Sequence, residues 1–290
     1  MKNIGLVLEG GGLRGVYSSG ILDYFLSRGL EFEYTIGVSA GAIYSASYAS
    51  KQKERNIDIF LKYLDDPRYM GVQHLLKTGS YINIEFAYKK MTYELSPFDF
   101  ETFYTCTKEF KVGAFNCEKG RTDYFCKKDF KSVDDLLEAL IASGSLPFFC
   151  NEMNIHGKTY LDGGIASPIP IQQSILDGNS KNVVILTEDD SYIKEPLGPE
   201  PLIKFYFRKY PKVASALINR HLVYNDTLEK IKVLEELGDV FVFRPSEKVE
   251  VDRLERNLDK VKYLYELGKK DAEKNYDSLM NWLKKNIQKN

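Results

Sequence analysis

The stretch Ile4–Gly15, read as IGLVLEGGGLRG, joins a short apolar run to a cluster of glycines. An aliphatic run of this length, bounded by glycine, predicts a buried β-strand. Apolar residues then recur at helical spacing over 16–26, which predicts a helix directly after the glycines. A second strand over 33–38 and a helix of small residues over 40–49 are expected next. This alternation of strand and helix predicts an α/β fold with a parallel core.

The rest of the chain predicts further elements around that core. We expect strands over 111–117, 121–126, 154–161, 183–187 and 240–243, a helix over 132–142, and short helices and loops in an aromatic-rich insertion over 65–105. From about residue 225 the pattern changes to long charged helices. We therefore predict a single domain over 1–290, with a motif-bearing core of about 4–188 and a helical C-terminal extension of about 225–290.

Composition argues against several classes of protein. The 290 residues include 43% hydrophobic and 28% charged side chains, and the net charge of -1 gives no overall field that would attract nucleic acid. The four cysteines form no CxxC pair and are too sparse for a disulfide scaffold, so no metal site is indicated. We find no signal-peptide pattern and no window of ~18 apolar residues. We therefore expect a cytoplasmic protein whose membrane contact, if it has any, is peripheral.

The spacing Gly10-x-Gly12-x-x-Gly15 matches the fingerprint of a dinucleotide-binding loop. That interpretation requires an acidic residue about 20 positions later, at the end of the second strand. Glu31 and Glu33 lie at the beginning of that strand instead, and Glu9 would face the phosphates unfavourably. A P-loop is excluded because no G-x-x-x-x-G-K-[ST] pattern occurs. Nucleotide binding by this loop stays open as an alternative function.

A second glycine motif, Gly37-Val38-Ser39-Ala40-Gly41, has the pattern G-x-S-x-G at the junction of a predicted strand and a predicted helix. This is the context of a nucleophile elbow, whose sharp turn lifts the serine above the sheet. Gly37 and Gly41 leave room for the turn, and Ala40 is small. The serine then lies at the positive end of the following helix. We infer that Ser39 is a candidate nucleophile.

The first glycine loop suits the charge that such a serine generates. A serine that attacks an ester forms a tetrahedral oxyanion, and preorganised donors stabilise it by roughly 3 to 4 kcal/mol each. A glycine-rich loop at a helix N-terminus offers several backbone N–H groups that point one way. We therefore assign an oxyanion hole to the loop residues and to the residue after the serine, namely Gly10, Gly11, Gly12, Leu13, Arg14, Gly15 and Ala40.

The base that would activate Ser39 is ambiguous from the residues alone. The chain has three histidines, His74, His156 and His221. The order Ser39, Asp162, His221 matches the triad order of α/β-hydrolases. However, His221 lies in a helical surface stretch with no turn to orient it. Asp162 is the other candidate, because Gly163 and Gly164 allow its backbone to approach another loop; in isolation these residues predict an ordinary Asp-Gly turn.

The motifs together resemble those of a known family. Residues 10–15, 37–41 and 162–164 are similar, in that order, to the three signature blocks of patatin-like phospholipases. The stretches 143–147 and 167–170 extend the resemblance, which covers about residues 4–188. The sequence Phe243-Arg244-Pro245-Ser246, followed by charged helices, resembles the bacterial branch of the family.

Two departures from the family pattern are visible. Gly163-Gly164 stands where many members have Gly-Ala, and Ser143-Gly144 replaces the commoner Ala-Ser. We expect the first to be harmless. The second is expected to alter a loop near the site while touching neither catalytic group.

The resemblance implies both a fold and a chemistry. The fold would be a three-layer α/β/α sandwich with a largely parallel sheet and added C-terminal helices. Ser39 would be the nucleophile and Asp162 the base of a dyad without histidine, with donors from Gly11, Gly12 and Leu13. We therefore predict a cofactor-free hydrolase that cleaves lipid or other carboxylic esters through an acyl-Ser39 intermediate. Acyl transfer by the same dyad stays open as an alternative, and the sequence leaves the oligomeric state undetermined.

Two further segments are candidates for lipid contact. Residues 202–224 mix aromatic and basic side chains without an acidic one, which is typical of a helix that touches anionic headgroups. A helix packed on the sheet with its lysines extending to solvent has the same pattern. The aromatic insertion is a candidate lining for an acyl pocket, through Tyr81, Phe86, Tyr88, Tyr93, Phe98, Phe100 and Phe103.

Overall fold

A computed structural model describes residues 3–287, and its centre is an eight-stranded mixed sheet. The parallel strands are β1 (Ile4–Leu8), β2 (Tyr34–Val38), β3 (Glu109–Asn116), β7 (Lys181–Ile185) and β8 (Val240–Phe243). The antiparallel strands are β4 (Arg121–Cys126), β5 (Met153–Ile155) and β6 (Lys158–Asp162). The order is β5-β6-β3-β2-β1-β7-β8, and β4 pairs with β3.

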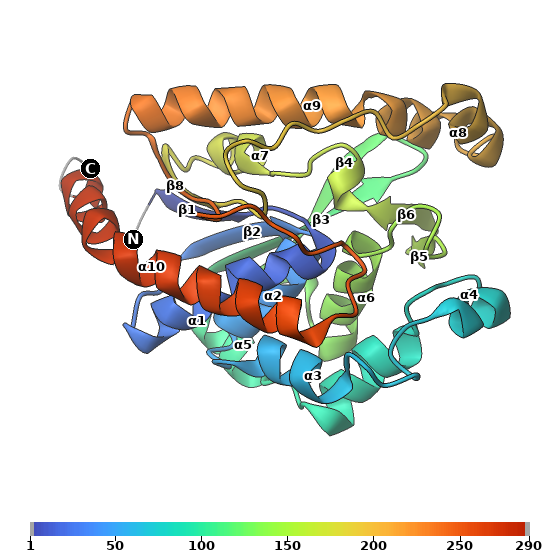
Figure 1. Cartoon of the computed structure of the whole chain (residues 1–290), viewed down its shortest axis with the longest axis horizontal. Coiled ribbons are helices and arrows are strands. Elements are labelled where there is room, and N and C mark those ends of the chain that lie inside the picture. The colour runs from blue at the N-terminus through green and yellow to red at the C-terminus, as the bar shows by residue number, and fades with distance from the viewer. Residues whose placement is uncertain (1–2, 288–290) are drawn as a thin grey trace.

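Helices cover both faces of the sheet and complete three layers (Figure 1). One face carries α1 (Val16–Ser27), α2 (Ala40–Ala49), α3 (Arg55–Tyr63), α5 (Phe100–Cys106), α6 (Val133–Ser143) and α10 (Leu258–Ile287). The other face carries α7 (Ile171–Leu176) and α9 (Pro211–Glu236). In Figure 1, α9 runs along the top of the view, while α1, α2 and α10 lie below the sheet. The predicted three-layer α/β fold with a largely parallel sheet is confirmed.

Every residue of β1 is buried, which explains why this strand lies at the centre of the sheet. Ile4, Leu6 and Leu8 pack with α1 and α10, whereas Val7 points to the opposite face and packs near Tyr224 of α9. Successive side chains of a strand point to opposite faces. A continuous apolar run is therefore what a strand covered on both faces requires.

The C-terminal region is integrated into this architecture. Helix α9 begins at Pro211, earlier than the boundary near residue 225 that the charge pattern suggested. The strand predicted over 240–243 is present as β8 and pairs with β7. The apolar stripe of α10, including Val261 and Leu264, packs in the core that contains α1. Within residues 3–287, no helix combines the length and apolar character that crossing a bilayer requires.

The aromatic insertion forms short elements, as predicted. They are α4 (Val72–Thr78), a wide π-type helix η2 (Glu85–Leu95) and α5. The amide of Ser96 donates to the carbonyl of Met91 at 2.8 Å, which is the five-residue spacing of that wide helix. A remaining short helix, α8 (Glu200–Tyr206), precedes α9.

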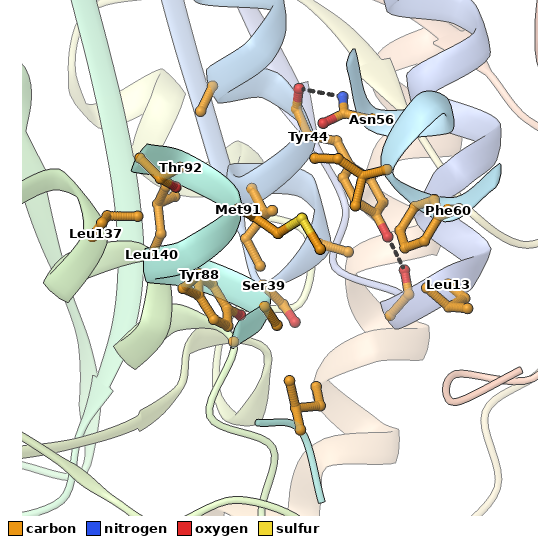
Figure 2. Close-up of a pocket in the computed structure, with 18 of the residues that line it drawn as sticks. Leu13, Ser39, Tyr44, Asn56, Phe60, Tyr88, Met91, Thr92, Leu137 and Leu140 are labelled. Atoms are coloured by element: carbon orange, nitrogen blue, oxygen red, sulfur yellow. Dashed lines mark hydrogen bonds between the residues drawn. The ribbon is translucent and has the colours of Figure 1, made fainter. Parts of the chain in front are cut away.

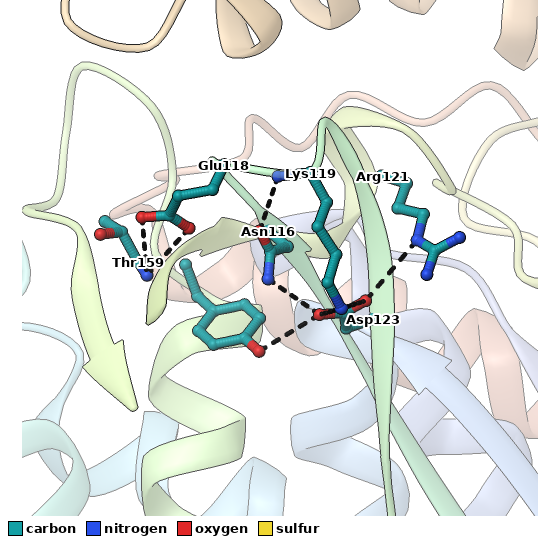
Figure 3. Close-up of polar contacts among 7 residues, drawn as sticks. Asn116, Glu118, Lys119, Arg121, Asp123 and Thr159 are labelled. Atoms are coloured by element: carbon teal, nitrogen blue, oxygen red, sulfur yellow. Dashed lines mark hydrogen bonds and ion pairs between the residues drawn. The ribbon is translucent and has the colours of Figure 1, made fainter. Parts of the chain in front are cut away.

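A polar network fixes the β3–β4 hairpin to β6 (Figure 3). The carboxylate of Asp123 on β4 accepts hydrogen bonds from Asn116 at 2.9 Å, Lys119 at 2.9 Å and the Tyr160 hydroxyl at 3.2 Å. The carboxylate of Glu118 accepts from the amide of Thr159 at 3.2 Å. Both contacts reach β6, so this network holds in place the strand that ends at Asp162.

Candidate active site

Strand β3 brings Ser39 and Asp162 together. Residues 111–116 of β3 pair with β4 along one edge of the strand. Along the other edge, β3 pairs first with β2, over residues 109–113, and then with β6, over residues 114–116. The end of β2, Val38, lies opposite Gly113, and the end of β6, Asp162, lies opposite Ala114. Because β2 runs parallel and β6 antiparallel to β3, their C-terminal ends meet head to head. The Ser39 hydroxyl donates a hydrogen bond to Oδ2 of Asp162 at 2.6 Å.

Ser39 occupies a strained turn between β2 and α2. Its backbone has φ 53° and ψ -130°, a conformation that residues other than glycine rarely adopt. The turn is tight: a Cβ on Gly37 would lie 2.6 Å from the Ala42 nitrogen, and one on Gly41 would lie 2.5 Å from the Glu9 carbonyl oxygen. The two motif glycines are therefore required by space, as the elbow pattern predicts.

Ser143 supports the elbow, contrary to the expectation that this position touches neither catalytic group. Its hydroxyl oxygen accepts a hydrogen bond from the Ser39 amide at 2.7 Å, and its proton goes to the Gly113 carbonyl at 2.6 Å. The backbone of Ser39 is thus tied to β3 through one buried side chain. In the sequence, only the family resemblance of the stretch 143–147 indicated this position, because a serine at the end of a helix has no distinctive pattern of its own.

The carboxylate of Asp162 is buried with few partners. Oδ2 accepts from Ser39, and Oδ1 accepts from the Gly164 amide at 2.7 Å. Burial raises the pKa of Asp162, while the Ser39 hydrogen bond and the positive charge of Arg220 oppose that rise. Arg220 on α9 donates through Nε to the Gly164 carbonyl at 2.5 Å. Gly163 fits against the Gly113 carbonyl, where a side chain would collide with it.

The glycine loop keeps some of its amides free. Within residues 3–287, the amides of Gly11, Gly12 and Ala40 have no hydrogen-bond acceptor. The amide of Gly10 donates to the Pro168 carbonyl at 3.1 Å, and that of Leu13 donates to the Arg253 carbonyl at 3.0 Å. The amide of Arg14 donates to the Gly11 carbonyl at 3.3 Å, so three of the predicted oxyanion donors are engaged within the protein. Three amides remain available on the loop and at the start of α2.

Gly15 has a packing role, and the side chain of Arg14 has an ion-pair role. A Cβ on Gly15 would lie 2.8 Å from the ring of Tyr44, so glycine allows close packing of α1 against α2. Arg14 forms an ion pair with Glu188 and donates through Nε to the Val251 carbonyl at 3.0 Å. Its guanidinium is therefore directed toward these two partners.

Glu9 is a site residue that sequence reasoning treated only as an obstacle to phosphate. Its buried carboxylate accepts hydrogen bonds from the Thr187 amide at 2.6 Å and from the Tyr224 hydroxyl at 2.8 Å. Burial raises the pKa of Glu9 against the effect of these bonds. Glu9, which directly precedes the glycine loop in the chain, thus joins the ends of β1 and β7 to α9.

A segment that we call the strap, residues 244–257, connects β8 to α10 and crosses the glycine loop. The Arg253 carbonyl accepts from Leu13, and the Val251 carbonyl accepts from Arg14. Gly12 has φ +59°, and a Cβ there would lie 2.5 Å from the Arg253 carbonyl oxygen. Only glycine satisfies both the conformation and the space at this position.

Two pockets open on either side of the dyad. The serine-side pocket has a volume of about 140 Å³, and its lining includes Ser39, Leu13, Phe60, Tyr88, Met91 and Leu140. Figure 2 shows Ser39 between Tyr88 and Leu13 in this pocket. Of the seven aromatic residues proposed for an acyl pocket, Tyr88 and Phe98 line it. The aspartate-side pocket, of about 390 Å³, is lined by Asp162, Gly164, Phe148 and three arginines.

The histidines are engaged outside the dyad. A ring nitrogen of His74 lies 2.7 Å from the Pro67 carbonyl, and one of His221 lies 3.0 Å from the Ile218 carbonyl. His156 has φ 50° in the turn between β5 and β6. In the described part of the chain, no group of three or more histidine, cysteine, aspartate or glutamate side chains is arranged to hold a metal ion.

A family model described as patatin-like phospholipase matches residues 6–175, which is 170 of the 290 residues. The chain belongs to the patatin-like phospholipase family. The resemblance that the three motifs indicated is therefore confirmed. A second model, a domain of unknown function, matches residues 210–284 of this patatin-like protein. That region includes α9, β8, the strap and most of α10.

Two curated relatives are similar to part of this chain. The uncharacterized protein YjjU of Escherichia coli K12 is 26% identical over 188 residues, or 63% of this chain and 52% of the relative. The probable lipid hydrolase 463L of Invertebrate iridescent virus 6 is 25% identical over 189 residues, or 61% of this chain and 65% of the relative. The chain thus matches between about half and two thirds of the length of these relatives.

The crystal structure of VipD from Legionella pneumophila is also similar to this patatin-like protein. The alignment covers 90% of this chain and 66% of that chain, with 14% sequence identity and a TM-score of 0.43.

Proposed function

We propose that this patatin-like protein is a serine acyl hydrolase that cleaves carboxylic ester bonds of lipids through an acyl-Ser39 intermediate. The observation that carries the proposal is the buried 2.6 Å hydrogen bond from the hydroxyl of Ser39, at a strained elbow, to the carboxylate of Asp162. Membership of the patatin-like phospholipase family supports the same chemistry. The viral relative that carries the printed name probable lipid hydrolase is consistent with a lipid substrate.

The proposed reaction has two steps that share one base. Ser39 Oγ attacks the ester carbonyl while Asp162 takes its proton, and the free amides of Gly11, Gly12 and Ala40 stabilise the oxyanion. The proton then passes to the alcohol oxygen as the carbon–oxygen bond breaks. Water attacks the acyl-serine in the second step, with Asp162 again acting as base. A carboxylate with a raised pKa is a stronger base than an ordinary one, which favours this transfer.

The serine-side pocket suits the acyl chain. Its walls are mainly aliphatic and aromatic, with Met91 and Tyr88 supplied by η2 and Leu137 and Leu140 by α6 (Figure 2). Burial of methylene groups stabilises binding by about 0.8 kcal/mol each. An apolar chain would therefore bind here with its carbonyl carbon next to Ser39.

The decisive experiment is covalent labelling of Ser39. A fluorophosphonate probe should form one stoichiometric adduct, and Ser39→Ala should abolish both the adduct and the hydrolysis of a p-nitrophenyl ester. Ser45→Ala is the matched control, because Ser45 is a buried serine on α2, the helix that follows Ser39, and its hydroxyl donates to the Ala42 carbonyl. Absence of an adduct, together with a thermal shift on adding NAD(H) or ATP, would favour nucleotide binding instead. Product analysis with an added alcohol distinguishes hydrolysis from acyl transfer.

We also propose that α8 contacts a lipid surface. Leu202 and Phe205 of α8 are 66% and 69% exposed, and the basic residues Lys204 and Arg208 lie beside them. The opposite face is packed, because Ile203 is buried in the core with α9. Phe205→Ser should reduce flotation with anionic vesicles, whereas Leu176→Ser, at an exposed leucine on α7, should not. Equal flotation of wild type with anionic and neutral vesicles would contradict this contact.

A further inference from the structure

Tyr88 of η2 lies next to the dyad but has no part in the reaction proposed above. It lines the serine-side pocket together with Ser39. Figure 2 shows Tyr88 and Leu13 on opposite sides of Ser39, so Tyr88 lies away from the glycine loop. The free amides of that loop are the proposed oxyanion donors. A different part of the substrate must therefore face Tyr88.

The hydroxyl of Tyr88 is an unused hydrogen-bonding group. Within residues 3–287 it has no hydrogen-bond partner. By comparison, the hydroxyl of the buried Tyr224 donates to the Glu9 carboxylate at 2.8 Å. A tyrosine hydroxyl that is withdrawn from water usually finds a partner. A bound substrate would supply the partner that the chain does not.

The surroundings of Tyr88 keep its hydroxyl protonated. Burial is the main cause that raises the pKa of Tyr88, and the neighbouring Cys150 and Asp162 add to the effect. A phenol with a raised pKa carries its proton at neutral pH and is available as a donor. The influence of Asp162 also indicates that the hydroxyl lies near the proposed base.

Contact with Gly144 fixes the position of this hydroxyl. A Cβ on Gly144 would lie 2.7 Å from the hydroxyl oxygen of Tyr88. The backbone of Gly144 has φ -98°, which any residue adopts, so space and not conformation requires glycine there. The missing side chain at Gly144 therefore leaves the place that the Tyr88 hydroxyl occupies.

The residues on either side of Gly144 hold the backbones of the dyad. Ser143 accepts a hydrogen bond from the Ser39 amide at 2.7 Å. The Ser145 carbonyl accepts one from the Asp162 amide at 2.9 Å. The tyrosine hydroxyl thus lies against the short segment that links nucleophile and base.

The substrate has one acceptor that suits this place. An ester carbon attacked by Ser39 carries an acyl chain, a carbonyl oxygen and an alcohol oxygen. In the proposed reaction the carbonyl oxygen faces the glycine loop, and an apolar chain accepts no hydrogen bond. The alcohol oxygen must lie within reach of Asp162, because the proton of Ser39 passes to it. Tyr88 lies near Asp162 and away from the loop, which is where that oxygen is expected.

We propose that Tyr88 is a further catalytic residue, whose hydroxyl donates a hydrogen bond to the alcohol oxygen of the ester as the carbon–oxygen bond breaks. This inference rests on the proposed function and adds a donor for the leaving group to it. Tyr88 keeps its own proton throughout. The bond from Ser39 Oγ to the acyl carbon forms, the bond from that carbon to the alcohol oxygen breaks, and the alcohol takes the proton that Asp162 received from Ser39. The hydrogen bond stabilises the negative charge that develops on the departing oxygen.

The test compares two esters of octanoic acid that differ only in the leaving group. An ethyl ester releases a strongly basic alkoxide unless its oxygen is stabilised, whereas p-nitrophenolate departs without help. Tyr88→Phe should therefore lower kcat/KM for the ethyl ester by about tenfold or more. The same variant should change kcat/KM for the p-nitrophenyl ester far less, because the acyl chain and the apolar wall are unchanged.

Tyr93→Phe is the matched control. Tyr93 lies on the same helix η2, is 50% exposed, and donates to Asp134 at 2.8 Å outside the pocket. This variant should leave the values of kcat/KM for both esters unchanged. Equal losses on the two esters in Tyr88→Phe would indicate a structural role and overturn this inference alone, as would an undiminished rate on the ethyl ester. A wild type that hydrolyses neither ester would instead overturn the proposed function, and this inference with it.

A double-mutant cycle tests whether the contact with Gly144 places the hydroxyl. Gly144→Ala puts a methyl group where the Tyr88 hydroxyl lies, so it should displace that hydroxyl and lower kcat/KM selectively for the ethyl ester. Added to Tyr88→Phe, the same substitution should have little further effect, because the atom that it displaces is already absent. Independent losses that multiply in the double variant would contradict the proposed placement.

Discussion

Two carboxylates on the same sheet, Asp162 and Asp123, have opposite environments. Asp123 accepts hydrogen bonds from Asn116, Lys119 and Tyr160 (Figure 3). Burial acts to raise the pKa of Asp123, but hydrogen bonds from Lys119 and Asn116 outweigh it, so that pKa is lowered. Burial dominates at Asp162, and its pKa is raised.

The difference shows how one residue type can fix a hairpin in one place and suit the proposed role of a base in another. At Asp123 the folded chain stabilises the charged form by direct pairing with an ammonium group. Arg220, whose positive charge lowers the pKa of Asp162, donates its Nε to the Gly164 carbonyl instead of pairing with the carboxylate. The charge on Asp162 is therefore only partly compensated, which leaves the carboxylate ready to accept a proton.

The largest expected effect is on catalysis. Asp162→Asn should lower kcat for a p-nitrophenyl ester by about 10,000-fold, because the amide cannot take the proton from Ser39. Asp123→Asn should retain activity near that of wild type, because Asp123 only fixes the hairpin. Comparable losses in the two variants would show that the hydrogen bond to Ser39 is not the source of activity.

The second effect concerns the pH dependence of the rate. Asp162 must be ionised to act as a base, and burial raises its pKa, so kcat should fall on acidification at a pH above the usual range for aspartate. Arg220→Gln removes a charge that opposes this rise and should move the acidic limb to higher pH. Asp123→Asn should leave the limb in place. Steady-state rates across the acidic range measure this, and an unmoved limb in Arg220→Gln would contradict the assignment.

The third expected effect is a gain in thermal stability when Asp162, the proposed base, is replaced. Because the folded state raises the pKa of Asp162, the ionised form at neutral pH opposes folding. Asp162→Asn should therefore raise Tm at pH 7. The difference should shrink as pH falls through the raised pKa, since wild type then takes up a proton in the folded state. Thermal melts at neutral and acidic pH test this, and a lower Tm for the variant at pH 7 would count against it.

The smallest effect has the opposite sign. The pKa of Asp123 is lowered by folding, so its contribution to stability is present above the unfolded-state pKa and is lost as pH falls through the folded one. Asp123→Asn should cost about 1 kcal/mol at neutral pH, since these pairs are partly exposed to solvent. Urea denaturation measures it. Stabilisation by this variant would remove the contrast with Asp162.

Sequence patterns predicted the secondary-structure elements and the two turns that carry Ser39 and Asp162, but not how these two turns come together. The elbow around Ser39 and the turn after Asp162 have local patterns that glycine spacing reveals. The alignment of β2 and β6 along β3 depends on pairing at Gly113 and Ala114, which no motif encodes. Long-range pairing of this kind is set by packing of the whole sheet.

The same limit applies to the walls of the site. Arg253 reaches the glycine loop through its carbonyl oxygen, an atom that every residue carries. A backbone contact of this kind leaves no mark on residue type. The close approach of the carbonyl does restrict residue type at Gly12, which must lack a side chain at that point. The loop motif alone already accounts for this glycine, so it could not have revealed the contact with Arg253.

The contact between the strap and the glycine loop has a consequence for the time at which the site is completed during synthesis. Ser39 and Asp162 both belong to the first 162 residues, whereas the residue that meets Leu13 is number 253. On the ribosome, the proposed nucleophile and base therefore emerge well before the strap residue that meets the glycine loop. A nascent chain carries both dyad residues for ninety further additions before Arg253 is incorporated, so the contact of the strap with the glycine loop can form only after that delay.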